Sequence, residues 1–138
     1  MVTLNRINDN FLFEAKGASD VSVFIDNKVD GEVNGVSPME LLLMGIGGCS
    51  AIDIILILKK QRQVVDSYKM EVEGKRKEVR GARPFESAHV TIYLEGDINP
   101  DKAKRAAALS FEKYCSVSIT MEGCVKVTYE IVLNGSVL

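Results

Sequence analysis

Apolar and polar residues alternate with a period of two in three parts of the chain, which is the pattern of β-strands with one buried face. These parts lie within residues 1–30, 66–97 and 116–134. The first predicts two or three short strands, the second a hairpin of two long strands, and the third a short helical turn followed by a last strand. Each of the two long strands of this hairpin is expected to have one buried and one solvated face.

Residues 38–62 carry the clearest helical signal, because a capping motif stands directly before a long apolar run. Ser37 can cap the helix, Pro38 suits its first position, and Glu40 can bond back to the backbone of Ser37. Basic side chains near the end of the run suit the negative end of the helix dipole. A second helix is predicted over residues 100–114.

The apolar run at residues 41–58 is long enough to raise the question of a membrane span. Three glycines crowd its centre, and Asp53 would cost about 3 kcal/mol in lipid. A helix that is apolar all round is also expected at the centre of a folded protein. Since the rest of the chain has the pattern of soluble strands and a second helix, the sequence favours a buried core helix and no membrane partner.

The composition is that of one soluble domain spanning residues 1–138. Of the 138 residues, 46% are hydrophobic and 26% are charged, and a chain of this size can bury a core without metal or disulfide staples. The net charge of -2 lacks the basic footprint that phosphate binding requires, so no nucleic-acid partner is expected. The N-terminal residues lack the pattern of a secretory signal, which predicts a cytoplasmic protein.

Three cysteines are the candidates for chemistry: Cys49, Cys115 and Cys124. Their odd number and wide spacing predict reduced thiols. The only histidine, His89, falls on the polar face of a predicted strand, so no metal site or histidine-based triad is expected. Cys49 fits a buried packing residue as well as a reactive thiol. Cys115 fits an ordinary helix-end residue, or a thiol whose pKa is lowered by the free amides of a following helical turn.

Three segments resemble the signature regions of the OsmC/Ohr family, which is named after osmotically inducible protein C and the organic hydroperoxide resistance protein. They are Ser-Pro-Met-Glu at 37–40, Met-Gly-Ile-Gly-Gly-Cys-Ser-Ala-Ile-Asp at 44–53 and Glu-Lys-Tyr-Cys-Ser-Val at 112–117. The resemblance is strongest to the YhfA-like branch, in which these three motifs occur together. The order of the predicted elements matches the family over nearly the whole chain.

The resemblance implies an α+β fold in which two chains intertwine as a homodimer, with antiparallel sheets around a central buried helix that carries Cys49. It also implies an antioxidant peroxidase of the oxidative stress response. Cys49 would attack an organic hydroperoxide and become a sulfenic acid, and Cys115 would resolve it as a disulfide. An external dithiol would reduce that disulfide, so no bound cofactor is expected.

The sequence departs from the peroxidase branches at the groups that support the thiolate. In those branches an arginine of the N-terminal strands holds the thiolate charge, and a glutamate directly after the helix-start proline orients it. Here Met39 follows Pro38, Glu40 stands one place later, and no arginine lies within residues 7–30. Glu40 is therefore both a candidate catalytic residue and a capping residue. The alternative function is binding of a hydrophobic or acyl ligand, or a redox switch, without peroxidase activity.

Overall fold

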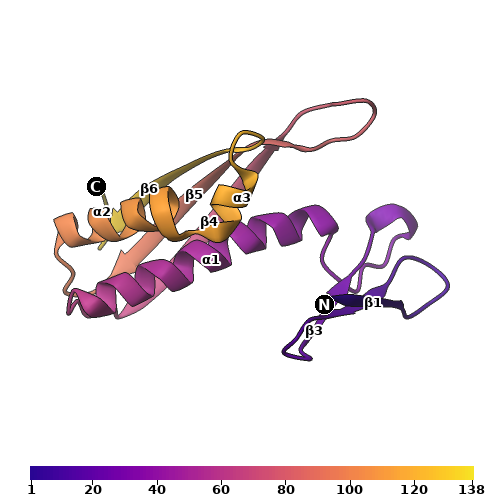
Figure 1. The fold of residues 1–138 in the computed structure, drawn as a ribbon, viewed down its shortest axis with the longest axis horizontal. Coiled ribbons are helices and arrows are strands. Elements are labelled where there is room, and N and C mark those ends of the chain that lie inside the picture. Colours follow the sequence, from indigo (N-terminus) through magenta and orange to yellow (C-terminus); the bar gives the residue numbers. More distant parts are fainter. The chain divides into compact units, whose positions relative to one another are not determined.

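The computed structural model describes residues 1–138, the side chain of Asp30 excepted, and the chain forms two compact units, 1–42 and 43–138. The first unit holds a three-stranded antiparallel sheet in the order β1-β2-β3 (Figure 1). A short 3-10 helix, η1, follows this sheet. The elements are β1 (Thr3–Arg6), β2 (Phe13–Lys16), β3 (Ser22–Ile25) and η1 (Lys28–Asp30).

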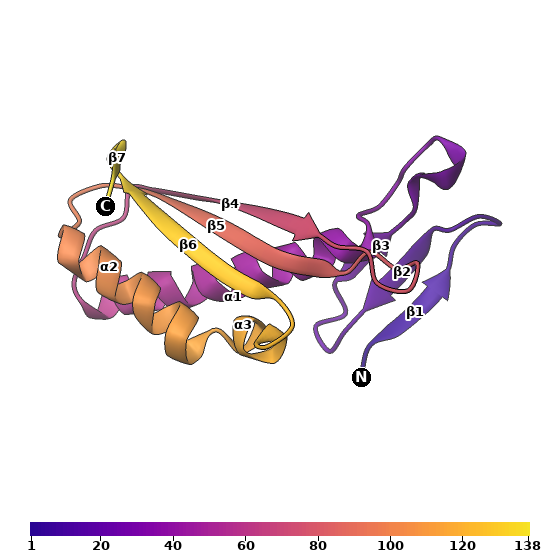
Figure 2. The same ribbon diagram turned by 90° about the horizontal axis from the view of Figure 1, so that it is seen from above.

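The second unit is a four-stranded sheet in the order β4-β5-β6-β7, and its helices lie on one face of that sheet (Figure 2). The strands are β4 (Ser67–Arg76), β5 (Phe85–Glu95), β6 (Lys126–Leu133) and β7 (Ser136–Val137). The helices are α1 (Pro38–Lys60), whose residues 38–42 belong to the first unit, α2 (Pro100–Leu109), the π-helical turn η2 (Ser110–Tyr114) and α3 (Ser116–Met121). The predicted α+β fold class is confirmed.

The core of the second unit lies between the sheet and its helices. Strand β5 is the most buried strand, because every second side chain from Ala88 to Leu94 is covered by the helices. Residues of α1 and α2 pack on it, and the Phe111 ring of η2 stacks on Tyr129 of β6 with centroids 4.6 Å apart. The apolar sides of the helices and of the sheet, which the periodicity of the sequence indicates, thus pack against each other.

One strand pair corrects the expectation of antiparallel sheets. Strands β5 and β6 run parallel, with Ser87 opposite Lys126 and Leu94 opposite Leu133. The physical reason is the connection between them, which contains α2, η2 and α3. A hairpin turn forces antiparallel pairing. A crossover of this length instead returns the chain to the end of the sheet at which β5 begins, so β6 runs in the same direction as β5. The short strand β7 was also not predicted.

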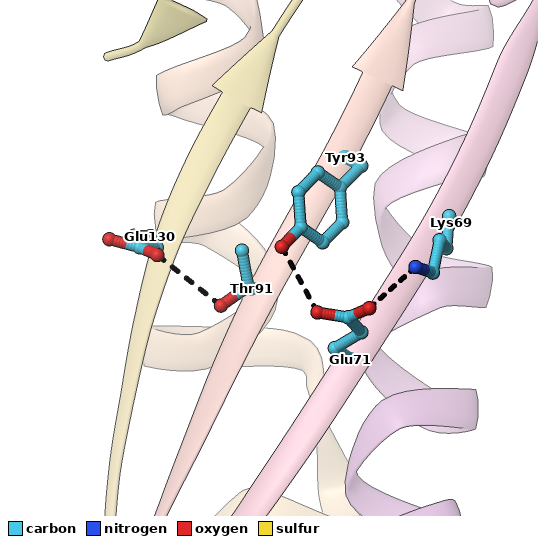
Figure 3. A network of polar contacts seen from close by, with 5 residues as sticks. All are labelled: Lys69, Glu71, Thr91, Tyr93 and Glu130. Atoms are coloured by element: carbon cyan, nitrogen blue, oxygen red, sulfur yellow. Dashed lines mark hydrogen bonds and ion pairs between the residues drawn. The ribbon is translucent and has the colours of Figure 1, made fainter. Parts of the chain in front are cut away.

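The outer face of this sheet is polar and carries a small hydrogen-bonded network (Figure 3). Lys69 Nζ lies 2.5 Å from Glu71 Oε1, and the Tyr93 hydroxyl donates to Glu71 Oε2 at 3.0 Å. The hydrogen bond from Lys69 is the largest cause that holds the pKa of Glu71 below its usual value. These contacts are solvated, so the sheet has one apolar and one polar face, as the alternation predicts.

Helix α1 is buried along one side only within the single chain. Ile46, Ile54 and Leu58 belong to the core, whereas Met44, Ile52 and Leu56 are exposed. It is also a helix whose length and composition would let it span a membrane, a test that core helices of soluble domains pass as well. Its buried residues pack on a sheet, which is the arrangement of a core helix.

Candidate thiol site

Cys49 is half-buried and lies in the middle of α1. The glycines before it have different surroundings. A Cβ on Gly47 would lie 3.0 Å from Val72 Cγ2 on β4, so this glycine lets the helix approach the sheet closely. A Cβ on Gly45 would lie 3.6 Å from Val117 of α3, which is ordinary contact. Helix α1 is therefore held against both β4 and α3 in the region of Cys49.

Cys115 lies between η2 and α3 and has 0% of its surface exposed. Its backbone is extended, and its N–H donates to the carbonyl of Ser110 at 2.7 Å, which closes the π-turn. Its own carbonyl accepts from the N–H of Ile119 at 3.0 Å and so begins α3. The helix predicted over 100–114 thus ends as regular α-helix at Leu109 and continues as a wider turn.

The structure brings Cys49 and Cys115 together, although they lie far apart in the sequence. Burial is the largest cause that raises the pKa of the Cys115 thiol, and hydrogen bonding and like charge from the neighbouring Cys49 add to it. The Ser118 hydroxyl opposes this by donating to Cys115 Sγ at 3.2 Å. Of the two alternatives for Cys115, a thiol whose pKa is lowered by the following helix is therefore not supported, because desolvation outweighs the hydrogen bonds from Ser118.

Glu40 occupies the capping box that its spacing predicts. The Ser37 N–H donates to Glu40 Oε2 at 2.8 Å, and the Glu40 N–H donates to Ser37 Oγ at 3.2 Å. The bond from the Ser37 backbone is the largest cause that lowers the pKa of Glu40. Among the described side chains, Glu40 forms no ion pair with an arginine. A catalytic role for Glu40 stays a prediction.

Arg6, the arginine of the N-terminal strands, is engaged within its own unit. Its Nε donates to the Asn10 carbonyl at 3.0 Å, and its Nη2 donates to the Asp9 carbonyl. These bonds close the turn after β1. In the described part of the chain, the groups that shift the pKa of Cys115 include no cation. The side chains that act on this thiol are thus the Ser118 hydroxyl and the Cys49 thiol.

Two residues that sequence reasoning missed connect α1 to the segment that carries Cys115. Ser110 is buried, and its hydroxyl lies 3.3 Å from Asp53 Oδ2 and 3.5 Å from the Ser50 carbonyl. The signals were present, since Ser110 is a polar residue on the apolar face of its helix. Asp53 is the only charge within the apolar run of α1. Cys124 is exposed and has no place in this arrangement.

A cavity of about 480 Å³ lies between the second half of α1 and α2. Asp53, Arg105 and Tyr114 contribute polar groups to its wall, and Leu56 and Leu109 contribute apolar surface. Asp53 follows Cys49 by one helical turn, and Tyr114 directly precedes Cys115. Within the described residues, no cluster of three or more His, Cys, Asp or Glu side chains could hold a metal ion. The arrangement is therefore suited to thiol chemistry or to binding of a small molecule.

Comparisons with known proteins concern the family and the fold of the chain. The family model described as OsmC-like protein matches residues 29–130. The chain is 35% identical over 127 residues to Protein YhfA of Escherichia coli (strain K12), which covers 90% of this chain and 92% of that protein. A hypothetical protein from Aquifex aeolicus VF5 has a similar structure, with a TM-score of 0.81, 31% identity, and coverage of 97% of this chain and 96% of that one.

The organic hydroperoxide resistance protein OhrB of Bacillus subtilis shares the fold at lower identity. Its TM-score is 0.69, its identity 18%, and the alignment covers 95% of this chain and 96% of that chain. At this level of identity the likeness concerns the fold alone.

Proposed function

This chain belongs to the OsmC-like family, and we propose that it is a thiol-dependent reductase of organic hydroperoxides that works through Cys49 and Cys115. The observation that supports the proposal is the adjacency of a half-buried thiol and a fully buried one. A substrate can reach Cys49 from solvent. Cys115, by contrast, is accessible to its neighbour and to little else. This difference supports attack by Cys49 and resolution by Cys115.

The proposed reaction has two steps, formation of a sulfenic acid and formation of a disulfide. The Cys49 thiolate attacks the distal peroxide oxygen, the O–O bond breaks, and the alkoxide takes a proton and leaves as an alcohol, so that Cys49 becomes a sulfenic acid. The Cys115 sulfur then attacks the Cys49 sulfur. Hydroxide leaves and takes the thiol proton as water, and a disulfide remains. An external dithiol reduces this disulfide and is itself oxidised.

The raised pKa of Cys115 suits a resolving thiol. A protonated and buried thiol does not react with oxidants in solution, because the thiolate is the nucleophile. It becomes useful when an electrophilic sulfur is placed beside it. The Ser118 hydroxyl already donates to Cys115 Sγ and can stabilise the negative charge that this sulfur carries after it loses its proton and before it attacks Cys49.

We also propose that the chain acts as a homodimer in the cytoplasm, where thiols are kept reduced, and that residues 1–138 function as one domain. The exposed side of α1 supports the dimer. Met44, Ile52 and Leu56 form an apolar stripe there, and Ile52 alone is 65% exposed. A second copy of the chain would cover this surface. Ile52→Glu should therefore shift the protein to a monomer in sedimentation experiments, whereas an exposed polar change such as Lys69→Glu should not.

A second candidate function is binding of a hydrophobic or acyl ligand. The cavity between α1 and α2 favours it, because its apolar wall is continuous with the polar groups of Arg105 and Asp53. The absence of a cation beside Cys115 among the described residues also weighs toward this reading. In that case the thiols would stay reduced in the presence of hydroperoxide.

Mass spectrometry of the reduced protein tests the proposal directly. One equivalent of cumene hydroperoxide should give a Cys49–Cys115 disulfide rapidly, and more rapidly than hydrogen peroxide does. Cys49→Ser should abolish turnover, Cys115→Ser should stop after one reduction at the Cys49 sulfenic acid, and Cys124→Ser is the matched control that should change little. Thiols that stay reduced, or equal losses in all three variants, would contradict the proposal.

A further inference from the structure

Ser110 is bonded to both thiol-bearing segments at once. Its hydroxyl faces Asp53 Oδ2 at 3.3 Å and the Ser50 carbonyl at 3.5 Å, and both acceptors belong to the helix that carries Cys49. Its backbone carbonyl accepts from the Cys115 N–H at 2.7 Å. One residue with 0% exposure thus links the helix of Cys49 to the backbone of Cys115.

The link coincides with the first residue of η2, a turn of unusual geometry. In a regular α-helix the Cys115 N–H would bond to the carbonyl four residues earlier, but here it bonds to the fifth, and the turn is wider by one residue. Such π-turns are rare and are frequently found at functional sites. The bond from Ser110 to α1 supplies support at the first residue of the turn. The turn ends directly before Cys115, which lies beside α1.

Asp53 has no other hydrogen-bond partner among the described side chains than Ser110. A hydroxyl has one hydrogen to donate, so Ser110 can bond to Asp53 or to the Ser50 carbonyl, or share the hydrogen between them. Either acceptor fixes the turn to the same helix. Asp53 is the stronger partner, because a carboxylate oxygen accepts a stronger bond than a carbonyl.

We propose that Ser110, with Asp53 as its acceptor, is a positioning residue that stabilises the Cys49–Cys115 disulfide relative to the dithiol. The inference rests on the thiol pair of the proposed function. Two thiols that are held side by side form a disulfide with little further loss of chain entropy. Release of the π-turn gives Cys115 more freedom in the dithiol form, which the disulfide must then remove. The protein disulfide should thus become easier to reduce when Ser110 is lost.

Equilibration with glutathione tests this without any peroxide. Oxidised glutathione and the two thiols give the protein disulfide and two reduced glutathiones, and alkylation followed by mass spectrometry measures the equilibrium constant. We expect Ser110→Ala to lower this constant about tenfold, which corresponds to a potential about 30 mV higher. Asp53→Ala should act in the same direction and more weakly, because the Ser50 carbonyl remains as an acceptor. Asp53→Asn keeps an accepting oxygen, so its equilibrium constant should lie close to that of the unchanged protein.

Ser116→Ala is the matched control, because Ser116 is exposed and directly follows Cys115. It should leave the potential unchanged. The double variant Ser110→Ala with Asp53→Ala should match Ser110→Ala alone, since both changes remove one bond. Urea unfolding of each reduced variant identifies loss of general stability, which does not by itself move the potential. An unchanged potential in a folded Ser110→Ala protein, or additive effects in the double variant, would overturn the inference.

The outcomes also separate this inference from the peroxidase proposal. If hydroperoxide leaves the thiols reduced but the glutathione equilibrium depends on Ser110, the positioning role stands and the peroxidase fails. If oxidised glutathione gives no Cys49–Cys115 disulfide, the positioning role is refuted as well.

Discussion

Ser118 donates a hydrogen bond from its hydroxyl to Cys115 Sγ at 3.2 Å, inside a site where the thiol has no exposed surface. Burial raises the pKa of Cys115, and Ser118 is the group that works against burial. The two effects act on the same sulfur. The pKa of Cys115 therefore reflects burial, which raises it, and the Ser118 hydrogen bond, which lowers it.

Ser118→Ala should slow closure of the disulfide and shift its pH dependence upward. The lost bond is worth about 1 kcal/mol, which corresponds to somewhat less than one pKa unit for Cys115. The rate of disulfide closure after a hydroperoxide pulse should fall several-fold at neutral pH and recover at higher pH. Thr120→Ala, which removes an exposed hydroxyl on α3, is the control. A closure rate that falls equally at every pH would point to misplacement of Cys115 instead.

The raised pKa of Cys115 also predicts a loss of stability at alkaline pH. Below the ordinary thiol pKa of 9.0 the group is protonated in both the folded and the unfolded chain. Its full contribution to the free energy of unfolding is then present. As the pH rises toward the folded pKa, the unfolded chain loses its proton first, so unfolding is favoured by up to about 1.4 kcal/mol per pH unit. Urea unfolding of the reduced protein between about pH 7 and pH 10 measures this slope.

Two variants test whether that slope comes from Cys115. Cys115→Ala should flatten it, and Cys124→Ser should leave it intact, because Cys124 is exposed. A slope that survives in Cys115→Ala would place the alkaline transition on other groups.

Tyr68 provides a prediction of the opposite kind, in which a substitution stabilises the fold. Its hydroxyl is covered, and no group among the described residues bonds to it. Burial also raises its pKa above the usual range. A buried hydroxyl without a partner costs about 1 to 3 kcal/mol, so Tyr68→Phe should raise the free energy of unfolding by about 1 kcal/mol.

Tyr93→Phe is the contrasting change for this test. The Tyr93 hydroxyl lies on the solvated face and donates to Glu71 at 3.0 Å, so its removal should not stabilise the protein. Urea unfolding of both variants at neutral pH makes the comparison. A loss of stability in Tyr68→Phe would mean that the hydroxyl is bonded in solution.

Local patterns in the sequence were sufficient for some features of this fold. The Ser37–Glu40 capping box is a short-range motif, and the structure forms both of its hydrogen bonds. Alternation identified which face of β5 is buried. It does not specify which strand lies beside β5 or in which direction that strand runs, so the parallel pairing with β6 was missed.

The thiol site depends on contacts that local patterns do not encode. The resemblance to the OsmC/Ohr family, and not the residue spacing, suggested that Cys49 and Cys115 meet. The π-turn before Cys115 begins at Ser110, whose hydroxyl bonds to α1, and helical periodicity carries no signal for such a turn, so it predicted a regular helix through residue 114. The sequence left the direction of the Cys115 pKa shift open for the same reason, because burial is a property of the assembled fold.

The close approach of α1 to β4 at Gly47 gives the last prediction. A Cβ at this position would lie 3.0 Å from Val72 Cγ2, and a β-branched side chain held in a sheet has little freedom to move away. Gly47→Ala should therefore destabilise the protein by about 1 kcal/mol, since strain exceeds the gain in helix propensity. Gly45→Ala, with only ordinary contact to Val117, should stabilise it by up to about 1 kcal/mol.

A double variant decides whether the contact with Val72 is the cause. If it is, Gly47→Ala should be less harmful when combined with Val72→Ala than when introduced alone, and the coupling between the two changes should be favourable. Chemical denaturation of the four proteins of this cycle gives the coupling energy directly. Additive effects, or a Gly47→Ala variant that is more stable than the starting protein, would show that α1 can move away from β4 at little cost. The tight packing of α1 beside Cys49 would then not be what fixes the position of this thiol.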